Sequence, residues 1–389
     1  MKRTRIALAS FCFGLAALGV QGAAGAQSEP YKVFETRPVI TEGPYLSALS
    51  DTSVSVMWMT DAPSHAKVRL SDGETVREIE PQVDGLVPVG LRHVVTIGGL
   101  APGKRYSYEA IATRVVKLKP YWPDKGLSTS SPAAGFTTFS PQQRNVSFSV
   151  VTDTHEDTAR IGRLMKMVDW ASTDALLHLG DAFHWLDSEE QLWAKWLRPT
   201  VAATGPGKPL LFARGNHELR GAFARQLAGY VPTPEGRYYY ARAMGPVHLL
   251  VLDTAEDKPD DTNVYAQLNR TVPYREDELA WLRAHASSNR HFADAPFRVV
   301  AMHQGDWGWL PDNGAAWTAL ANQAGVDLVI AGHDHAFSYQ APDKAHAYHR
   351  LILGQDQLAR VDASERSLTV KVITDKGAPV HTFTIPSRR

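Results

Sequence analysis

The chain has 389 residues, of which 44% are hydrophobic, and its 41 basic residues balance 41 acidic ones. This length permits two domains with packed cores, and the charge balance argues against a nucleic-acid or anionic-membrane partner. The single cysteine, Cys12, precedes every predicted domain. Any metal bound by the rest of the chain must therefore be held by nitrogen and oxygen.

The first residues have the pattern of a secretory signal peptide. Basic residues precede an apolar segment over about residues 6–20, and Ala24-Gly25-Ala26 follows as a small-residue cleavage site. The apolar segment is shorter than the roughly 20 residues that a membrane span needs, which argues against a retained anchor. We therefore expect cleavage of residues 1–26, a secreted or periplasmic protein, and no membrane association after cleavage.

Residues 38–140 alternate between apolar and polar with period two, which predicts an all-β sandwich. Val54, Val56 and Trp58, for example, fall on one face of a strand. The segment from Leu100 to Tyr106 resembles the corner of a fibronectin type III domain, in which the tyrosine hydroxyl bonds back to nearby backbone. We expect a fibronectin III-like domain that carries no chemistry.

From residue 144 to 386 the pattern changes to alternating strands and helices, which predicts an α/β domain. Ser188 is expected to cap one of the helices. We expect an open α/β sheet, with alternating strands at 368–373 and 380–385 completing a second sheet. The predicted strands of the open sheet cover residues 146–151, 175–179, 209–213, 247–252, 297–302 and 326–331, and the helices cover 160–170, 188–197 and 275–288.

Five polar clusters follow the predicted strands. Ligands of open α/β sheets bind outside the carboxyl ends of the strands, where all five clusters fall. Their carboxylates, amide and imidazoles form a hard-to-borderline donor set suited to iron, manganese or zinc. The clusters are Asp153-Thr154-His155, Gly180-Asp181, Gly215-Asn216-His217-Glu218, His303 and Gly332-His333-Asp334-His335.

In this order the clusters resemble the motifs of the calcineurin-like metallophosphoesterase family. With the fibronectin-like front domain, the chain is similar to purple acid phosphatases. The resemblance implies a four-layer αββα catalytic domain and two metal ions that share the carboxylate of Asp181. The implied ligands are Asp153, His155, Asp181 and His335 for one ion, and Asp181, Asn216, His303 and His333 for the other.

The resemblance also implies a reaction, in which a metal-bridging hydroxide attacks a phosphate ester. Asp181 would be catalytic as the bridging carboxylate. His217 would stabilise the transferring phosphoryl group and protonate the leaving oxygen. Asn216 and His217 would contact the substrate.

The chain departs from the purple acid phosphatases at two ligand positions. Those enzymes carry glycine where His155 stands and a metal-bound tyrosine where His184 stands. We therefore expect no tyrosinate colour, and the resemblance no longer implies a fixed ferric ion. His184 could be a ligand, a substrate contact or a support for the ligands; we favour a non-ligand role, because His155 already fills the vacant coordination.

The loop at 304–312 also departs from the family, which often has a proline after the histidine corresponding to His303. Two of its tryptophans, Trp307 and Trp309, could line the mouth of the site together with Trp185. Hydrophobic packing within the loop is the alternative.

The leading hypothesis is a phosphatase that acts on small-molecule phosphomonoesters. The alternative within the same chemistry is a phosphodiesterase, because an Asp-x-His first motif is common among diesterase relatives. From another class, the chain could be a surface-binding protein with a structural metal site. The complete ligand set and the presence of His217 argue against that last alternative.

Overall fold

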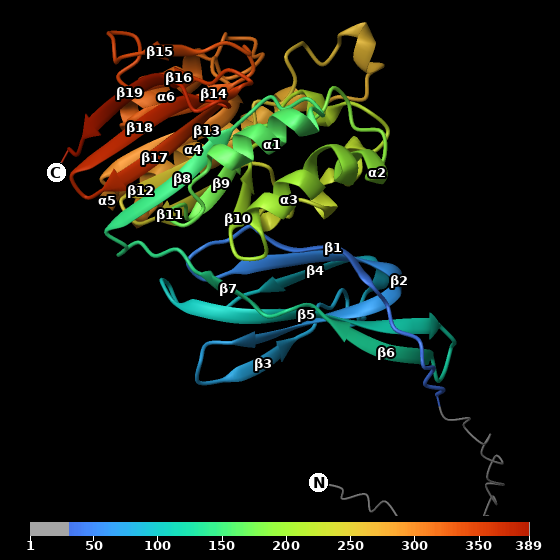
Figure 1. Ribbon diagram of the computed structural model, residues 1–389. Helices are drawn as coiled ribbons and strands as arrows, with labels where there is room; N and C mark the ends of the chain where they lie inside the picture. Colours follow the sequence, from blue (N-terminus) through green and yellow to red (C-terminus); the bar gives the residue numbers. More distant parts are fainter. Residues whose placement is uncertain (1–30, 389) are drawn as a thin grey trace, which may run out of the picture.

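The computed structural model describes residues 31–388, so the predicted signal peptide at 1–26 lies outside the described residues. The chain forms an all-β part, which runs from β1 to β7, and an α/β part that begins at β8 and stacks on top of it (Figure 1). Within residues 31–388, no helix combines the length and the apolar character that a membrane crossing requires.

The all-β part is built around the long strand β2. The first half of β2 pairs with β1 and β4, and its second half pairs with β3 and β5, so the strand passes from one layer to the next. Trp58 from the first half and Val68 from the second lie in one buried cluster with Tyr108. The strands are β1 (Ile40–Ser47), β2 (Val54–Ser71), β3 (Val76–Ile79), β4 (Val89–Ile97), β5 (Arg105–Lys117), β6 (Asp124–Ser130) and β7 (Ala134–Thr137).

This part agrees with the all-β structure expected at 38–140, and the tyrosine corner is present. The backbone N–H of Ala101 donates to the hydroxyl of Tyr106 at 2.9 Å. The likeness to fibronectin type III domains stays a prediction, as do the domain boundaries.

The α/β part contains two sheets, and the expectation that all six predicted strands lie in one of them was wrong. In the first sheet β8, β9 and β10 are parallel. Strand β17 pairs with β8, and the tail strands β18 and β19 extend this sheet from β17 instead of completing the second one. Strand β10 also pairs with β1, so this sheet continues into the all-β part. Its strands here are β8 (Asn145–Val151), β9 (Ala175–His178), β10 (Pro209–Phe212), β17 (Gln357–Ser364), β18 (Ser367–Thr374) and β19 (Pro379–Pro386).

The second sheet contains three of the strands that we had placed in the first. Its strands β12, β13 and β14 are parallel to one another, and β16 continues them in the same direction. Its members are β11 (Tyr240–Met244), β12 (Val247–Val251), β13 (Phe297–Gln304), β14 (Leu328–Gly332), β15 (Ser338–Gln340) and β16 (His349–Ile352).

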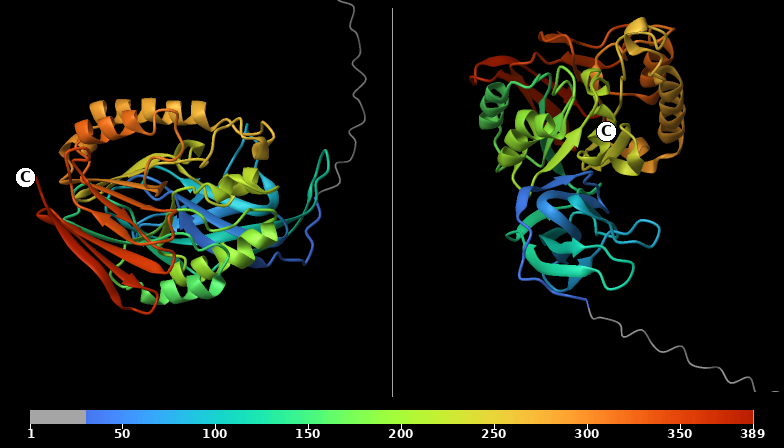
Figure 2. Two further views of the ribbon diagram at one scale, coloured as in Figure 1. Left: turned by 90° about the horizontal axis from the view of Figure 1, so that it is seen from above. Right: turned by 90° about the vertical axis from the view of Figure 1, so that its right-hand side faces the viewer.

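The two sheets pack face to face, and helices cover both outer faces (Figure 2). Phe148 of β8 and Val299 of β13 share the cluster between the sheets. Leu164 of α1 packs on the outer face of the first sheet, and Leu282 of α4 packs on that of the second. The α/β part thus has the four layers that the resemblance implied.

The helices begin and end close to the predicted positions, and Ser188 caps its helix, since its Oγ accepts from the backbone N–H of Gln191 at 3.1 Å. The first face carries α1 (Thr158–Met167), α2 (Glu189–Leu192), the π-helical turn η1 (Trp193–Leu197) and α3 (Arg198–Thr204). The second carries α4 (Thr271–Ser288), α5 (Arg290–Asp294) and α6 (Ala315–Ala324). Short 3-10 turns are η2 (His217–Leu219), η3 (Ala224–Gly229), η4 (Pro234–Gly236) and η5 (Asn263–Tyr265).

Candidate metal centre

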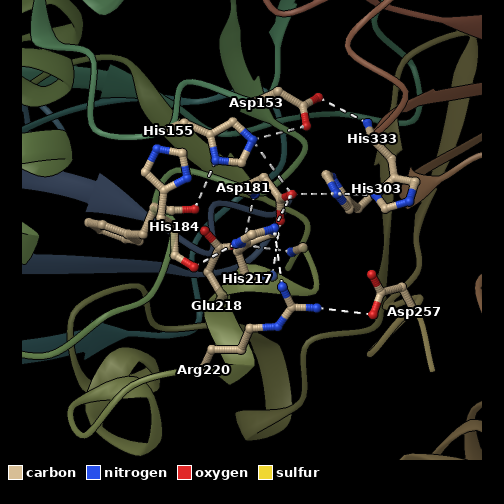
Figure 3. Close-up of polar contacts among 12 residues, drawn as sticks. Asp153, His155, Asp181, His184, His217, Glu218, Arg220, Asp257, His303 and His333 are labelled. Carbon is tan, nitrogen blue, oxygen red and sulfur yellow. Dashed lines mark hydrogen bonds and ion pairs between the residues drawn. The ribbon is translucent and has the colours of Figure 1, made fainter. Parts of the chain in front are cut away.

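The predicted ligands meet where parallel strands of both sheets end (Figure 3). Asp153 follows β8, Asp181 follows β9, His303 lies near the end of β13, and His333 follows β14. The backbone N–H of His333 donates to Oδ2 of Asp153 at 2.9 Å, which joins the two sheets at this point. The structure therefore brings distant parts of the sequence into one site.

Five of the predicted ligands have left-handed backbone conformations. Side chains other than glycine adopt such φ angles at a cost of about 1–3 kcal/mol each, and they persist where the surrounding structure holds them. Here each strand ends in a sharp turn that directs the next side chain to the centre. The residues are Asp153 (φ 51°), His155 (41°), Asp181 (52°), His333 (73°) and His335 (56°).

The first group of ligand atoms comes from Asp153, His155 and His335, which lie within 4.8 Å of one another. The Nε2 atoms of His335 and His155 lie 3.3 and 3.8 Å from Oδ1 of Asp153. That oxygen is buried, and within residues 31–388 it has no hydrogen bond of normal geometry. A buried carboxylate oxygen facing two imidazole nitrogens fits a metal ion.

The second group comes from Asp181, His303 and His333. His303 Nε2 lies 3.1 Å from Asp181 Oδ2, and His333 Nδ1 lies 3.3 Å from His303 Nε2. Asn216 is buried, and neither its amide oxygen nor its amide nitrogen has a hydrogen-bond partner within the described part of the chain. Such a side chain is costly to bury unless something else binds it, so its amide oxygen also fits a metal ion.

Asp181 lies between the two groups. Its Oδ2 is 3.1 Å from His303 Nε2 in the second group and 3.8 Å from His155 Nε2 in the first. Its Oδ1 accepts the backbone N–H of His217 at 3.1 Å. This is the position that a carboxylate bridging two ions requires.

Two ligand histidines are oriented by backbone carbonyls. Nδ1 of His155 lies 3.1 Å from the carbonyl of Phe183, and Nδ1 of His303 lies 2.7 Å from that of Leu179. Because a carbonyl can only accept, Nδ1 carries the hydrogen in each ring and Nε2 faces the centre. This is the usual support for a metal-binding imidazole.

Burial and neighbouring carboxylates set the charges of these groups. Burial lowers the pKa of His155 to about 4 despite the nearby Asp181 and Asp153. At His303 burial also opposes the charged form, but Asp181 and Asp153 outweigh it and raise its pKa to about 10. Burial opposes ionisation of Asp181 too, yet the charge of His303 and the hydrogen bond from it hold the pKa of Asp181 well below the usual range. Asp181 is therefore an anion at the middle of the site.

Glu218 organises the turns that carry the ligands. Its carboxylate accepts backbone N–H groups from Asp181, Ala182 and Gly215 at 2.7 to 2.8 Å. Burial, together with the charge of Asp181, raises its pKa to about 7. Glu218 belongs to one of the predicted motifs, but its position in the sequence does not indicate this role, because hydrogen bonds to backbone leave no trace in residue spacing.

His217 lies beside the centre and contacts a residue that the sequence analysis missed. Its Nδ1 lies 2.6 Å from the carbonyl of His184, and its Nε2 lies 3.8 Å from Asp181 Oδ2. Nη1 of Arg220 donates to the same Nε2 at 3.2 Å. Since an arginine can only donate, His217 carries its hydrogen on Nδ1 and presents a lone pair at Nε2.

His184 is brought to the site, where its ring stacks on His155 with centroids 4.8 Å apart. Nitrogen atoms of His155, His184 and His217 lie within 4.8 Å of one another. Of the tryptophans, Trp307 is only 4% exposed and stacks on Trp317, which fits packing within the loop. Trp185, next to His184, is 56% exposed.

Comparisons with known proteins agree with this geometry. Residues 146–337 match the family model described as calcineurin-like phosphoesterase. Human acid phosphatase type 7 is 24% identical over 315 residues, which are 75% of this chain and 62% of that protein. The chain thus spans less than two thirds of the length of this curated relative.

Two solved structures share the fold. The purple acid phosphatase PPD1 from yellow lupin seeds superposes with a TM-score of 0.66 at 14% identity, covering 90% of this chain and 74% of that one. PhoD superposes with a TM-score of 0.59 at 12% identity, covering 90% and 92%. Residues 146–337 match the family model and bring the two candidate ligand groups together at Asp181. They therefore form a domain of the calcineurin-like phosphoesterase family.

Proposed function

We propose that the chain is a metal-dependent phosphoric ester hydrolase that acts on phosphomonoesters of small molecules. The observation that carries this proposal is the meeting of two ligand groups at one buried carboxylate, Asp181. The family of the domain and its likeness to acid phosphatase type 7 support the same reaction class.

The two ions would be held as the resemblance implies. His155 and His335 would bind one ion with Asp153, and His303 and His333 would bind the other with Asn216, while Asp181 serves both. The oxygen and nitrogen donors suit iron, manganese or zinc. When bound, such ions supply an activated water and offset the charge of the phosphate oxygens.

The protein side of the reaction would rest on His217. The hydrogen bond from Nδ1 to the carbonyl of His184 fixes the ring so that Nε2 points to the centre. In that position Nε2 can contact the phosphoryl group and pass a proton to the leaving oxygen. Before Nε2 can donate a proton, it must release the hydrogen bond from Arg220 and take up a proton itself. His184, stacked on His155, is a candidate substrate contact.

A phosphodiesterase is the second candidate. The observation that favours it is His155 itself, because the Asp153-x-His155 motif is common among diesterase relatives and the ring lies in the first ligand group.

The test is turnover of an aryl phosphomonoester and a bis-aryl phosphodiester by one preparation with metal analysis. We expect two ions per chain, faster turnover of the monoester, and loss of activity on chelation that added metal restores. Faster turnover of the diester would establish the second candidate. Activity that survives complete removal of metal would contradict both.

We also propose that the protein is secreted or periplasmic, on the strength of the N-terminal pattern. N-terminal sequencing of protein from its native host should begin after Ala26. A chain that begins at Met1 would contradict export by cleavage.

A further inference from the structure

Two acidic residues from another part of the chain, Glu256 and Asp257, hold the guanidinium of Arg220 beside the centre. Figure 3 shows the contact with Asp257. Nε and Nη2 of Arg220 donate to the two carboxylate oxygens of Glu256 at 3.3 and 2.8 Å, and Nη2 also donates to Asp257 at 3.0 Å. The Glu256 side chain is buried and accepts a further hydrogen bond from the hydroxyl of Tyr265. The fold therefore fixes the direction of the guanidinium.

The remaining nitrogen, Nη1, faces the ligand groups. It lies 3.2 Å from Nε2 of His217, which is itself 3.8 Å from the carboxylate of Asp181. A guanidinium has five N–H donors, and the contacts within residues 31–388 engage Nε, Nη2 and one hydrogen of Nη1. The second hydrogen on Nη1 has no acceptor within residues 31–388.

We propose that Arg220 is a substrate-binding residue whose Nη1 donates to a non-bridging oxygen of the bound phosphoryl group. The proposal rests on the proposed function, because it places the phosphoryl group at the ligand centre next to His217. Glu256 and Asp257 offset the positive charge of Arg220. Arg220 would therefore contribute a directed hydrogen bond to the phosphoryl group more than a long-range electrostatic attraction. The planar fork of arginine can contact both oxygens of Glu256 and still direct Nη1 to a phosphoryl oxygen, whereas a lysine presents its three donors from one atom and cannot reproduce this geometry.

The test is calorimetric titration of inorganic phosphate into metal-loaded protein. We expect Arg220→Met to lower phosphate affinity by about 10- to 100-fold, the usual effect of losing a charge-assisted hydrogen bond, with unchanged metal content. Arg225→Met is the matched control, because Arg225 is an exposed arginine in η3, and it should keep the wild-type affinity. Unchanged phosphate affinity in Arg220→Met would overturn the proposal, as would wild-type protein that binds no phosphate.

Two further variants keep the test decisive if Arg220→Met folds poorly. Arg220→Lys should bind phosphate more weakly than wild type, and Glu256→Gln, which loosens the contact that directs Arg220, should do the same with the arginine intact. Wild-type affinity in both variants would overturn the proposal. Phosphate binding is measured without turnover, so a wild-type protein that binds phosphate but hydrolyses no ester would reject the proposed function and leave the Arg220 contact established.

Discussion

At the scale of single residues, the role of His217 can be tested by varying the leaving group. An alkoxide leaves badly without a proton, whereas a nitrophenolate leaves well, so a missing acid matters more for alkyl esters. General acid catalysis typically contributes 10²- to 10⁴-fold. We expect His217→Ala to keep its metal, to lose roughly that factor on alkyl phosphates, and to lose distinctly less on activated aryl phosphates, as measured by kcat.

Asp181→Asn supplies the contrast for this experiment. Removing the charge between the two ligand groups should lower metal content and reduce activity on every substrate alike. An equal loss on alkyl and aryl esters in His217→Ala would show instead that His217 stabilises the phosphoryl charge. Loss of metal from His217→Ala would place it among the ligands, as its 3.8 Å distance from Asp181 permits.

The sequence predicted those residues of the centre that come directly after a strand, because the carboxyl ends of parallel strands lie at one edge of an α/β sheet. Asp153, Asp181 and His333 were found in this way, and the structure places them together. It could not predict Arg220 and Glu256. They are 36 residues apart, neither belongs to a recognisable motif, and only the path of the loop after β12 brings them into contact.

At the scale of secondary-structure elements, the contact between β12 and α4 should make the fold sensitive to acid. His248 of β12 is buried, its Nε2 lies 2.9 Å from Nε2 of His285 in α4, and its Nδ1 has no hydrogen-bond partner in the described chain. Burial, and then the positive charges of His285, His291 and Arg298, lower the pKa of His248 to about 3 from 6.5. The folded state thus resists protonation of a group that the unfolded state protonates readily.

The sign of the effect follows from these values. Between pH 3 and 6.5 the unfolded chain binds more protons at His248, so stability falls as the pH falls through this range. At pH 5 the loss from this one group amounts to about 2 kcal/mol. We expect His248→Gln to lose correspondingly less unfolding free energy than wild type between pH 7 and pH 5, measured by denaturant titration. The control is His346→Gln, because His346 is not among the groups that act on His248. An identical pH dependence in wild type and His248→Gln would contradict the prediction.

The residue patterns predict which segments form strands, but they do not predict how those strands pair. The apolar runs at 146–151 and 297–302 were recognised as buried strands, and both are strands in the structure. Such runs are apolar on both faces, so the same residue pattern fits a buried strand in either of the two packed sheets. Which sheet each strand joins depends on its pairing partners, and that is why placing all six predicted strands in one sheet was wrong.

At the scale of the whole molecule, the all-β part and the α/β part share one sheet and two buried hydrophobic clusters. Strand β1 pairs in parallel with β10, and Tyr45 and Met57 lie in the cluster that also contains Phe212 and Trp193. The hydroxyl of Tyr108 donates to the carbonyl of Pro206 at 2.7 Å. Each part therefore covers a strand edge and apolar surface of the other.

We expect a chain that lacks residues 31–140 to aggregate or to remain unfolded, because its β10 would present an open strand edge beside an uncovered apolar face. The full chain should unfold in a single calorimetric transition. The matched control is a full chain with a protease site inserted near Gln142 and cleaved after folding, because this keeps every contact between the two parts. The cleaved pieces should remain together and keep the transition, whereas a soluble, monomeric truncated chain with the same melting temperature would show that the α/β part folds without the all-β part.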